Sequence, residues 1–286
     1  METNAETIAS IAATGAPMSQ AQIRHRLEAF DTWKIAPGSR VLEIGCGQGD
    51  GTVVLAHLVG PAGHVTGLDP APLDYGSPMT LGEAQAKLKA GPLGSRITFQ
   101  QSTLQAFLAS DAAAPVYDYA VFCRCLWYFP SPDSLLPLFA ALRGRARKLL
   151  VAQYTLDTRG DLAALPHLLA ALSQGALNCG AYHPASDIHD NVQCVITPSM
   201  IRDAARKEGW QLEIEEIVEA ALEVEDAQWE VDNVLSERYI ARVNGQEDVS
   251  RQDYGRAILE ALETAKSGLG PASSLRTLPS WLGTWT

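Results

Sequence analysis

Long hydrophobic runs, paired cysteines and positive charge are all scarce in this sequence. No uninterrupted apolar stretch reaches the length that a membrane helix needs, so we expect no membrane insertion. The five cysteines, at positions 46, 123, 125, 179 and 194, form no C-x-x-C pair, and their odd count argues against a disulfide framework. Residues 1–19 also lack the basic segment that precedes the apolar run of a secretory signal. We therefore expect buried thiols in a reducing, cytoplasmic compartment.

Acidic residues outnumber basic ones by 33 to 22, which gives a formal net charge of −11. Such a field repels phosphate backbones and anionic lipid headgroups, so we expect no nucleic-acid partner. Hydrophobic residues make up 47% and charged residues 19% of the 286 residues, as is usual for globular chains. This composition excludes wholesale disorder and leaves room for one large α/β domain or two small ones.

Short apolar runs alternate with amphipathic segments from about residue 40 to beyond residue 150. The predicted strands cover residues 40–44, 64–68, 96–101, 117–122 and 148–154, and the helices between them cover 51–58, 80–90, 104–109 and 133–145. This alternation predicts βαβ units and a doubly wound, mostly parallel sheet. A helix over residues 19–33 precedes it.

The most specific motif follows the first predicted strand, where Gly45, Gly47 and Gly49 alternate before a helix begins. Glycines there allow a tight turn and a close approach of the backbone to a ligand, and the helix offers free N–H groups. Eighteen residues after Gly51, the second strand ends at Asp69, whose carboxylate can accept hydrogen bonds from a ribose diol. The pattern indicates a nucleotide-type site, with a purely structural glycine turn as the alternative.

The spacing does not match a dinucleotide fingerprint, which needs G-x-G-x-x-G. Counted from Gly45 the sixth residue is Asp50, and counted from Gly47 it is Thr52. Glu43 and Asp50 are also unfavourable beside a pyrophosphate, whereas they suit a cofactor that carries ammonium and sulfonium charge. A different nucleotide site stays open at this point.

The segment Glu43-Ile-Gly45-Cys-Gly47-Gln-Gly49 resembles the first motif of the class I S-adenosylmethionine-dependent methyltransferases, an apolar strand that ends in acidic-x-Gly-x-Gly-x-Gly. Together with Asp69, the resemblance implies a seven-stranded Rossmann-like fold and S-adenosylmethionine as the cofactor. It implies methyl transfer to a small molecule, at an oxygen or nitrogen of a secondary metabolite, quinone precursor or similar acceptor. The product would be S-adenosylhomocysteine.

The resemblance also implies roles for individual residues. The three glycines, with Cys46 between them, would line the methionine part of the cofactor, and Glu43 would orient its amino group through water. Asp69, followed by Pro70, would hold the ribose hydroxyls. After the third strand the family often has an aspartate facing the adenine, but this chain departs from that pattern. Ser102 and Thr103 stand there instead, and the Thr103 oxygen is the adenine-contact candidate.

The segment after the fourth strand faces the acceptor in similar enzymes. We expect a backbone contact from Cys123 to the cofactor and an aromatic wall for the acceptor from Trp127 and Tyr128, joined by Tyr182 from a later loop. Core packing is the alternative for these aromatics, and the favoured one for Phe129. The Asn/Asp-Pro-Pro-aromatic tetrad of enzymes that methylate bases or glutamine is absent, which argues against a nucleic-acid base as acceptor.

Candidates for a general base lie in the polar segment between residues 178 and 194. His183 and His189 titrate in a suitable range, although histidines in such loops are commonly only solvated or capping groups. Asp187, His189, Asp190 and Asn191 are competent metal ligands, but four ligands within five residues suit a turn better than a coordination shell, so we expect no metal. Arg24, His25 and Arg26 are able to close over the cofactor or meet an acidic acceptor, but a solvated basic turn is an equally favoured interpretation, so they are left out of the site.

The resemblance and the spacing together divide the chain into four segments: an N-terminal helical cap (1–34), a cofactor-binding core (35–154), a lid or substrate insertion (155–196) and a C-terminal completion of the sheet with an extension (197–286). The last segment is expected to hold a helix over 198–209, a strand over 211–217 and a helix over 250–266. Residues 276–286 form either a final strand or an irregular tail.

Two other functions stay open. A related enzyme can bind the cofactor and catalyse a non-methylating reaction such as a cyclisation or rearrangement, and a noncatalytic subunit can keep the fold to hold a partner. Intact Gly45, Gly47, Gly49 and Asp69 argue against the second, because a scaffold without a ligand has no physical need for that combination. The oligomeric state is left open.

Overall fold

The computed structural model describes residues 20–76, 79–110, 116–178, 192–270 and 274–286. Its strands are β1 (Arg40–Ile44), β2 (His64–Asp69), β3 (Ile97–Gln101), β4 (Tyr117–Cys123), β5 (Ala146–Tyr154), β6 (Leu212–Val218) and β7 (Ser280–Trp285). They form one sheet in the order β3-β2-β1-β4-β5-β7-β6, and β7 is antiparallel to both of its neighbours. The expected doubly wound, mostly parallel seven-stranded sheet is therefore confirmed.

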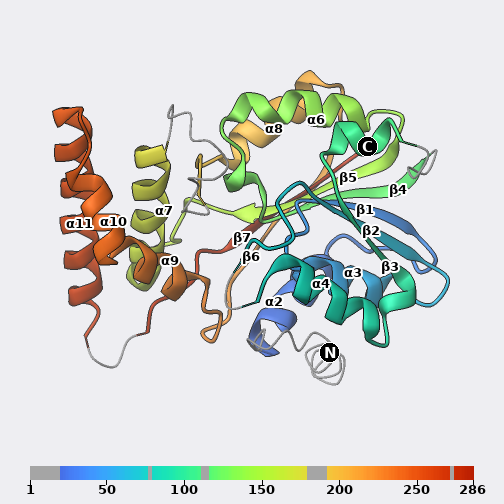
Figure 1. Cartoon of the computed structure of the whole chain (residues 1–286), viewed down its shortest axis with the longest axis horizontal. Coiled ribbons are helices and arrows are strands. Elements are labelled where there is room, and N and C mark those ends of the chain that lie inside the picture. The colour runs from blue at the N-terminus through green and yellow to red at the C-terminus, as the bar shows by residue number, and fades with distance from the viewer. Residues whose placement is uncertain (1–19, 77–78, 111–115, 179–191, 271–273) are drawn as a thin grey trace.

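Helices cover both faces of this sheet (Figure 1). One face carries α2 (Gln20–Asp31), α3 (Asp50–Leu58) and α4 (Leu81–Ala90), and the other carries α5 (Leu104–Leu108), α6 (Leu135–Leu142) and α8 (Pro198–Lys207). A separate group lies beyond one edge of these layers: α7 (Leu165–Asn178), α9 (Asp226–Val234), α10 (Glu237–Asn244) and α11 (Val249–Gly268).

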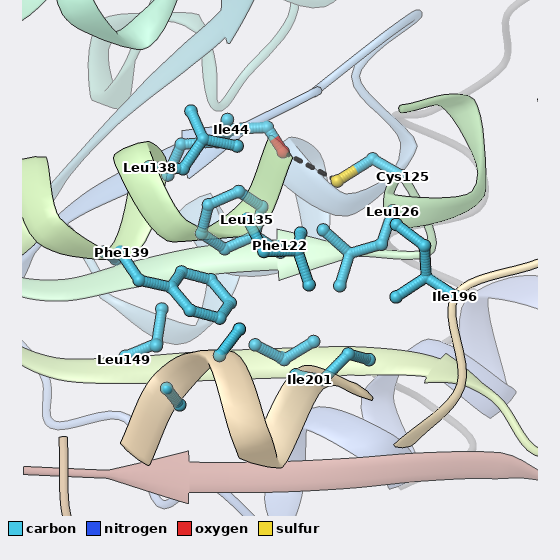
Figure 2. Close-up of a cluster of buried hydrophobic side chains, with 14 of the residues drawn as sticks. Ile44, Phe122, Cys125, Leu126, Leu135, Leu138, Phe139, Leu149, Ile196 and Ile201 are labelled. Atoms are coloured by element: carbon cyan, nitrogen blue, oxygen red, sulfur yellow. Dashed lines mark hydrogen bonds between the residues drawn. The ribbon is translucent and has the colours of Figure 1, made fainter. Parts of the chain in front are cut away.

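Strand residues alternate between the two faces, which produces two buried clusters. Val41 packs under α2 and α3, whereas the next residue, Leu42, packs under α5 and α6, and both side chains are fully buried. Figure 2 shows the second cluster, in which the Phe122 and Phe139 rings meet edge to face at 5.6 Å. Removing these side chains from water is the main source of stability on this face.

Most predicted elements appear within a few residues of their expected bounds. The helix expected over 133–145 stops at Leu142, because the chain turns at Gly144, where φ is +74°, and enters β5 at Ala146. The strand expected over 117–122 runs one residue further, to Cys123, and Cys125 lies beyond its end. The final segment, left open between strand and tail, contains β7.

The connection between β6 and β7 contains two helices, α9 and α10, that were not predicted. Signals for both exist in the sequence, since Ala227, Val231 and Val234 follow helical spacing and Ser236 caps α10 by accepting a hydrogen bond from the Tyr239 N–H. With α7 and α11 these helices enclose their own core around Tyr239.

The four-segment division at residues 34, 154 and 196 stays a prediction. The α7 helix lies in the segment that we expected to be an insertion (155–196). It packs on α9 and α11, which belong to the fourth segment. Among the helices of the described ranges, none combines the length and the apolar character that crossing a membrane requires.

A substitution in the Figure 2 cluster tests this account of the core. Phe139→Ala leaves a cavity against Phe122 and α8, so we expect the free energy of unfolding to fall by about 3–5 kcal/mol in urea denaturation. Leu162→Ala is the control, because that side chain is 72% exposed and its loss should change stability by less than about 0.5 kcal/mol. Equal effects from the two variants would refute the packing described.

Candidate active site

The turn from β1 into α3 requires glycine for two different reasons. Gly45 has φ +73°, and a Cβ there would lie 2.6 Å from Cys125 Cβ, so no side chain fits. Gly47 has φ +52°, but a Cβ there would meet no protein atom within 4 Å. The space in front of Gly47 is therefore open to a ligand, which a side chain would obstruct.

Hydrogen bonds hold this turn from both sides. The Gly45 and Cys46 N–H groups donate to the Leu68 carbonyl at 2.8 and 3.0 Å. The Asp69 carboxylate accepts from the Gly47 N–H at 2.8 Å and from the Ala71 N–H at 2.9 Å. Asp69 thus positions the turn as well as standing at the predicted ribose site, at the carboxyl end of β2.

Glu43 is buried behind the turn. Its side chain accepts a hydrogen bond from the Thr52 hydroxyl at 2.5 Å, and a Cβ on Gly51 would overlap its Oε1 atom. Burial raises the pKa of Glu43 to about 8, although the Thr52 hydrogen bond opposes the rise. At neutral pH this carboxyl group is therefore mostly protonated in the free protein.

A cavity of about 640 Å³ opens at the carboxyl ends of the strands. Of the predicted cofactor-binding residues, its lining includes Glu43, Gly45, Cys46, Gly47 and Cys123. Of the predicted acceptor residues, it includes Trp127 and Tyr128. The structure thus brings the glycine turn and the aromatic segment after β4 to one hollow, as expected for sites at the carboxyl ends of parallel strands.

Other predicted site residues are not part of the lining of this cavity: Gly49, Asp69, Pro70, Ser102 and Thr103. Ser102 is nonetheless next to Asp69, because its N–H donates to the Asp69 carbonyl at 3.1 Å. The Thr103 hydroxyl accepts from the Ala106 N–H and caps α5. Their roles stay predictions.

Three predicted residues, Tyr182, His183 and His189, fall outside the described residues, as does the rest of 179–191 in the polar segment around them. Phe129 packs against the cluster of Figure 2, so core packing is confirmed for it. The Cys125 thiol donates to the Ile44 carbonyl at 3.1 Å (Figure 2). Burial raises the pKa of Cys125 well above its usual value and that of Cys123 to about 11, so neither is a thiolate nucleophile.

Of the two interpretations left open for residues 24–26, the solvated turn is wrong for His25 and Arg26. His25 is fully buried and lies 3.2 Å from the Ser280 hydroxyl. Arg26 is 9% exposed, lines the cavity and lies 3.8 Å from Asp50. Its spacing from Ile23 and Phe30 places it on the inner face of α2, a signal that was available in the sequence.

The charged groups around the turn suit S-adenosylmethionine. Two Arg26 nitrogens, Nε and Nη1, are buried without a hydrogen-bond partner among the described residues, and such donors match a carboxylate. The Asp50 carboxylate lines the same part of the cavity and matches the ammonium and sulfonium charges, and the Glu43 carboxyl group beside it offers hydrogen-bond acceptor oxygens. The residues present therefore fit both ends of an amino-acid group.

A second buried network was missed entirely from the sequence. Arg124 has φ +53°, and its N–H donates to the Ala152 carbonyl at 2.7 Å. Its guanidinium donates to the Ser280 hydroxyl at 3.0 Å and lies 3.7 Å from Asp226 of α9. The Tyr154 hydroxyl donates to the same Asp226 oxygen at 2.5 Å.

This network holds Asp226 in its charged form. Burial alone would raise the pKa of Asp226, but the guanidinium groups of Arg124 and Arg26 and the Tyr154 hydrogen bond outweigh burial and lower it to about 2. The segments involved are separated by tens of residues, so no local pattern could have shown their meeting.

The two glycines of the turn should respond differently to a methyl group. We expect Gly47→Ala to weaken binding of S-adenosylhomocysteine by at least about tenfold in calorimetry, while positive φ costs only about 1–2 kcal/mol of stability. Gly45→Ala should lose more stability than Gly47→Ala, because its Cβ overlaps Cys125. Full affinity in a folded Gly47→Ala protein would contradict a ligand in front of this turn.

The raised pKa of Glu43 predicts a pH-dependent stability. Between its ordinary value of 4.5 and about 8, the unfolded chain loses this proton while the folded chain keeps it, so stability falls as pH rises. Comparison with Glu43→Gln in urea denaturation isolates the effect, since Gln still accepts the Thr52 hydrogen bond. The wild-type value should decline relative to the variant by up to about 1.4 kcal/mol per pH unit, and parallel curves would rule the shift out.

Comparisons with known proteins agree with this geometry. A family model described as "Methyltransferase domain" matches residues 41–144, and one for protein-L-isoaspartate(D-aspartate) O-methyltransferase matches residues 3–74. Methyltransferase phomM of Diaporthe leptostromiformis is 32% identical over 232 residues, which cover 65% of this chain and 59% of that protein. The chain thus spans about three fifths of the length of this curated relative.

Solved structures extend the likeness to the whole chain. A cyclopropane-fatty-acyl-phospholipid synthase-like protein from Lactobacillus casei is 32% identical, with a TM-score of 0.84 and full coverage of both chains. The cyclopropane synthase MmaA2 from Mycobacterium tuberculosis shares the fold at 16% identity, with a TM-score of 0.52 over 93% of this chain and 84% of that chain. With the glycine turn, the sheet order and these relatives in agreement, the chain belongs to the class I S-adenosylmethionine-dependent methyltransferases.

Proposed function

We propose that this chain transfers a methyl group from S-adenosylmethionine to an oxygen or nitrogen atom of a small-molecule acceptor and releases S-adenosylhomocysteine. One observation carries the proposal: the glycine turn and the aromatic segment after β4 line the same cavity. Its volume of about 640 Å³ falls in the range of small-molecule sites. The net charge of −11 supports a small acceptor rather than nucleic acid, and the buried thiols of Cys46 and Cys125 support a cytoplasmic setting.

The cofactor, when bound, supplies an electrophilic methyl carbon on a positively charged sulfur. The chain itself has to bind and align the two reactants and keep water away from them. Arg26, Glu43 and Gly47 are proposed to hold the amino-acid part, and Asp69 the ribose. Trp127 and Tyr154, which are 3% and 7% exposed, form dry walls on the acceptor side.

The need for a base depends on the acceptor atom. A neutral amine already has a free lone pair, whereas a phenol or carboxylic acid must first lose a proton. His183 and His189 stay our proposed bases for such acceptors. Asp226 is a weak base, because its pKa of about 2 favours a charged carboxylate that accepts hydrogen bonds.

Binding and transfer are tested in that order. Calorimetry should give micromolar or tighter binding of S-adenosylhomocysteine and none of NAD. Incubation with methyl-labelled cofactor and a panel of phenols, carboxylic acids and amines should then give labelled product together with S-adenosylhomocysteine. A rearranged acceptor without label would show a non-methylating enzyme, and failure to bind either nucleotide would point to a noncatalytic subunit.

A further inference from the structure

Arg124 is held in a constrained position in the wall of the cavity. Its backbone has φ +53°, which a residue with a side chain adopts only where the surrounding contacts impose it. Its N–H donates to the Ala152 carbonyl at 2.7 Å, its Nη2 atom donates to the Ser280 hydroxyl at 3.0 Å, and its guanidinium carbon lies 4.9 Å from the centre of the Tyr154 ring. Such strain is concentrated at ligand sites, and Arg124 lines the cavity. The guanidinium is therefore fixed before a ligand binds.

The Nη1 atom of this guanidinium has a charged neighbour but no hydrogen bond. The Asp226 Oδ1 atom lies 3.7 Å away, which is close enough for an ion pair but too far for a hydrogen bond. Both oxygens of that carboxylate already accept hydrogen bonds, Oδ1 from the Tyr154 hydroxyl at 2.5 Å and Oδ2 from the Gln22 amide at 3.4 Å. The Arg124 side chain is only 8% exposed, and Nη1 has no hydrogen-bond partner among the described residues. The positive charge is thus compensated, whereas the N–H donor is not.

These two facts discriminate among the chemical classes of acceptor. An ammonium group carries only N–H donors, so it cannot accept a hydrogen bond from Nη1. A carboxylate would add a second negative charge beside Asp226, which already matches the Arg124 guanidinium. An apolar molecule would leave the buried N–H without a partner, at a cost in free energy. A neutral oxygen atom with free lone pairs meets both requirements.

Aromatic rings from three separate segments border the same cavity. Tyr75 after β2, Tyr128 after β4 and Trp229 of α9 line it, and they are 44%, 54% and 54% exposed. Large aromatic side chains are normally withdrawn from water, so exposed rings that gather at one cavity indicate a surface that a ligand covers. Aromatic faces pack favourably on other flat rings. The rim therefore suits a flat acceptor.

We propose that the acceptor is a neutral, flat molecule with a carbonyl group, and that Arg124 Nη1 donates a hydrogen bond to the carbonyl oxygen. A carbonyl oxygen only accepts hydrogen bonds, and its lone pairs lie in the plane of an attached ring. One molecule can therefore stack on the aromatic rim and reach the guanidinium with its edge. This inference rests on the proposed methyl transfer and adds a carbonyl group to its acceptor, separate from the oxygen or nitrogen atom that is methylated.

Three probes of the same shape test the proposal on the full chain saturated with S-adenosylhomocysteine. Acetophenone carries the neutral carbonyl, α-methylstyrene has a CH₂ group in place of its oxygen, and benzoate carries a charged carboxylate. In titrations followed by ligand-observed NMR, we expect acetophenone to bind at least about fivefold more tightly than benzoate. Equal or tighter binding of benzoate, or no binding of acetophenone, would overturn the proposal.

Infrared spectroscopy reports the hydrogen bond directly in the wild-type chain. Donation to a carbonyl oxygen weakens the C=O bond and lowers its stretching frequency. In isotope-edited difference spectra, the carbonyl of bound ¹³C-labelled acetophenone should therefore absorb at or below its frequency in water. A frequency equal to that in hexane would show a carbonyl without a donor and would overturn the proposal.

Matched substitutions locate the donor. Arg124→Lys keeps a positive charge opposite Asp226 but removes the fixed Nη1 atom, so acetophenone should weaken at least about fivefold while α-methylstyrene changes by less than about twofold. Arg143→Lys is the control, because that guanidinium also stacks on a ring, 4.6 Å from the centre of Trp210, but is outside the cavity lining. It should leave both probes unchanged. Equal responses of the two probes to Arg124→Lys would refute the hydrogen bond.

The two proposals fail in distinguishable ways. Loss of S-adenosylhomocysteine binding by the wild-type chain would refute the proposed methyl transfer. Retained S-adenosylhomocysteine binding without the expected acetophenone results would refute only the carbonyl acceptor. Circular dichroism checks that each variant is folded, and the wild-type infrared measurement decides the question if Arg124→Lys does not fold.

Discussion

The Asp226 carboxylate is where three parts of the chain meet. It accepts a hydrogen bond from Tyr154 at the end of β5, lies 3.4 Å from the Gln22 amide of α2, and faces Arg124 after β4. Removing one partner from such a buried pair leaves an uncompensated charge and typically costs about 3–5 kcal/mol. This contact joins the sheet to the separate group of helices α7, α9, α10 and α11. The position of α9, and with it the acceptor side of the cavity, depends on it.

The parts of the site that the sequence predicted are those in which one short segment contains the whole signal. The run from Glu43 to Gly49 specifies the end of a strand, a turn and the start of a helix. Asp69 is the last residue of the next strand, β2. The sheet could also be predicted from the sequence, because segments with strand periodicity and segments with helix periodicity alternate along the chain. In these regions, residues that are close together in the sequence also lie together in the folded site.

The buried network of Arg124, Tyr154 and Asp226 could not be predicted in the same way. Arg124, Tyr154 and Asp226 come together only through the sheet order and the packing of α9, and no spacing along the chain encodes their contact. Arg26 is an intermediate case, since its helical face was visible but its charge favoured a solvated position. Buried charges are hard to foresee because their cost is offset by partners from distant segments.

The position of β7 has a consequence for how this chain is made. Within the part of the chain that the structure describes, β6 pairs only with β7, and β7 is inserted antiparallel between β6 and β5. During synthesis β6 therefore leaves the ribosome long before its neighbour exists, with α9, α10 and α11 translated in between. Until residues 280–285 emerge, the nascent chain exposes an open edge at β5 and an unpaired strand at β6, which is the stage at which chaperone capture or misassembly competes with folding.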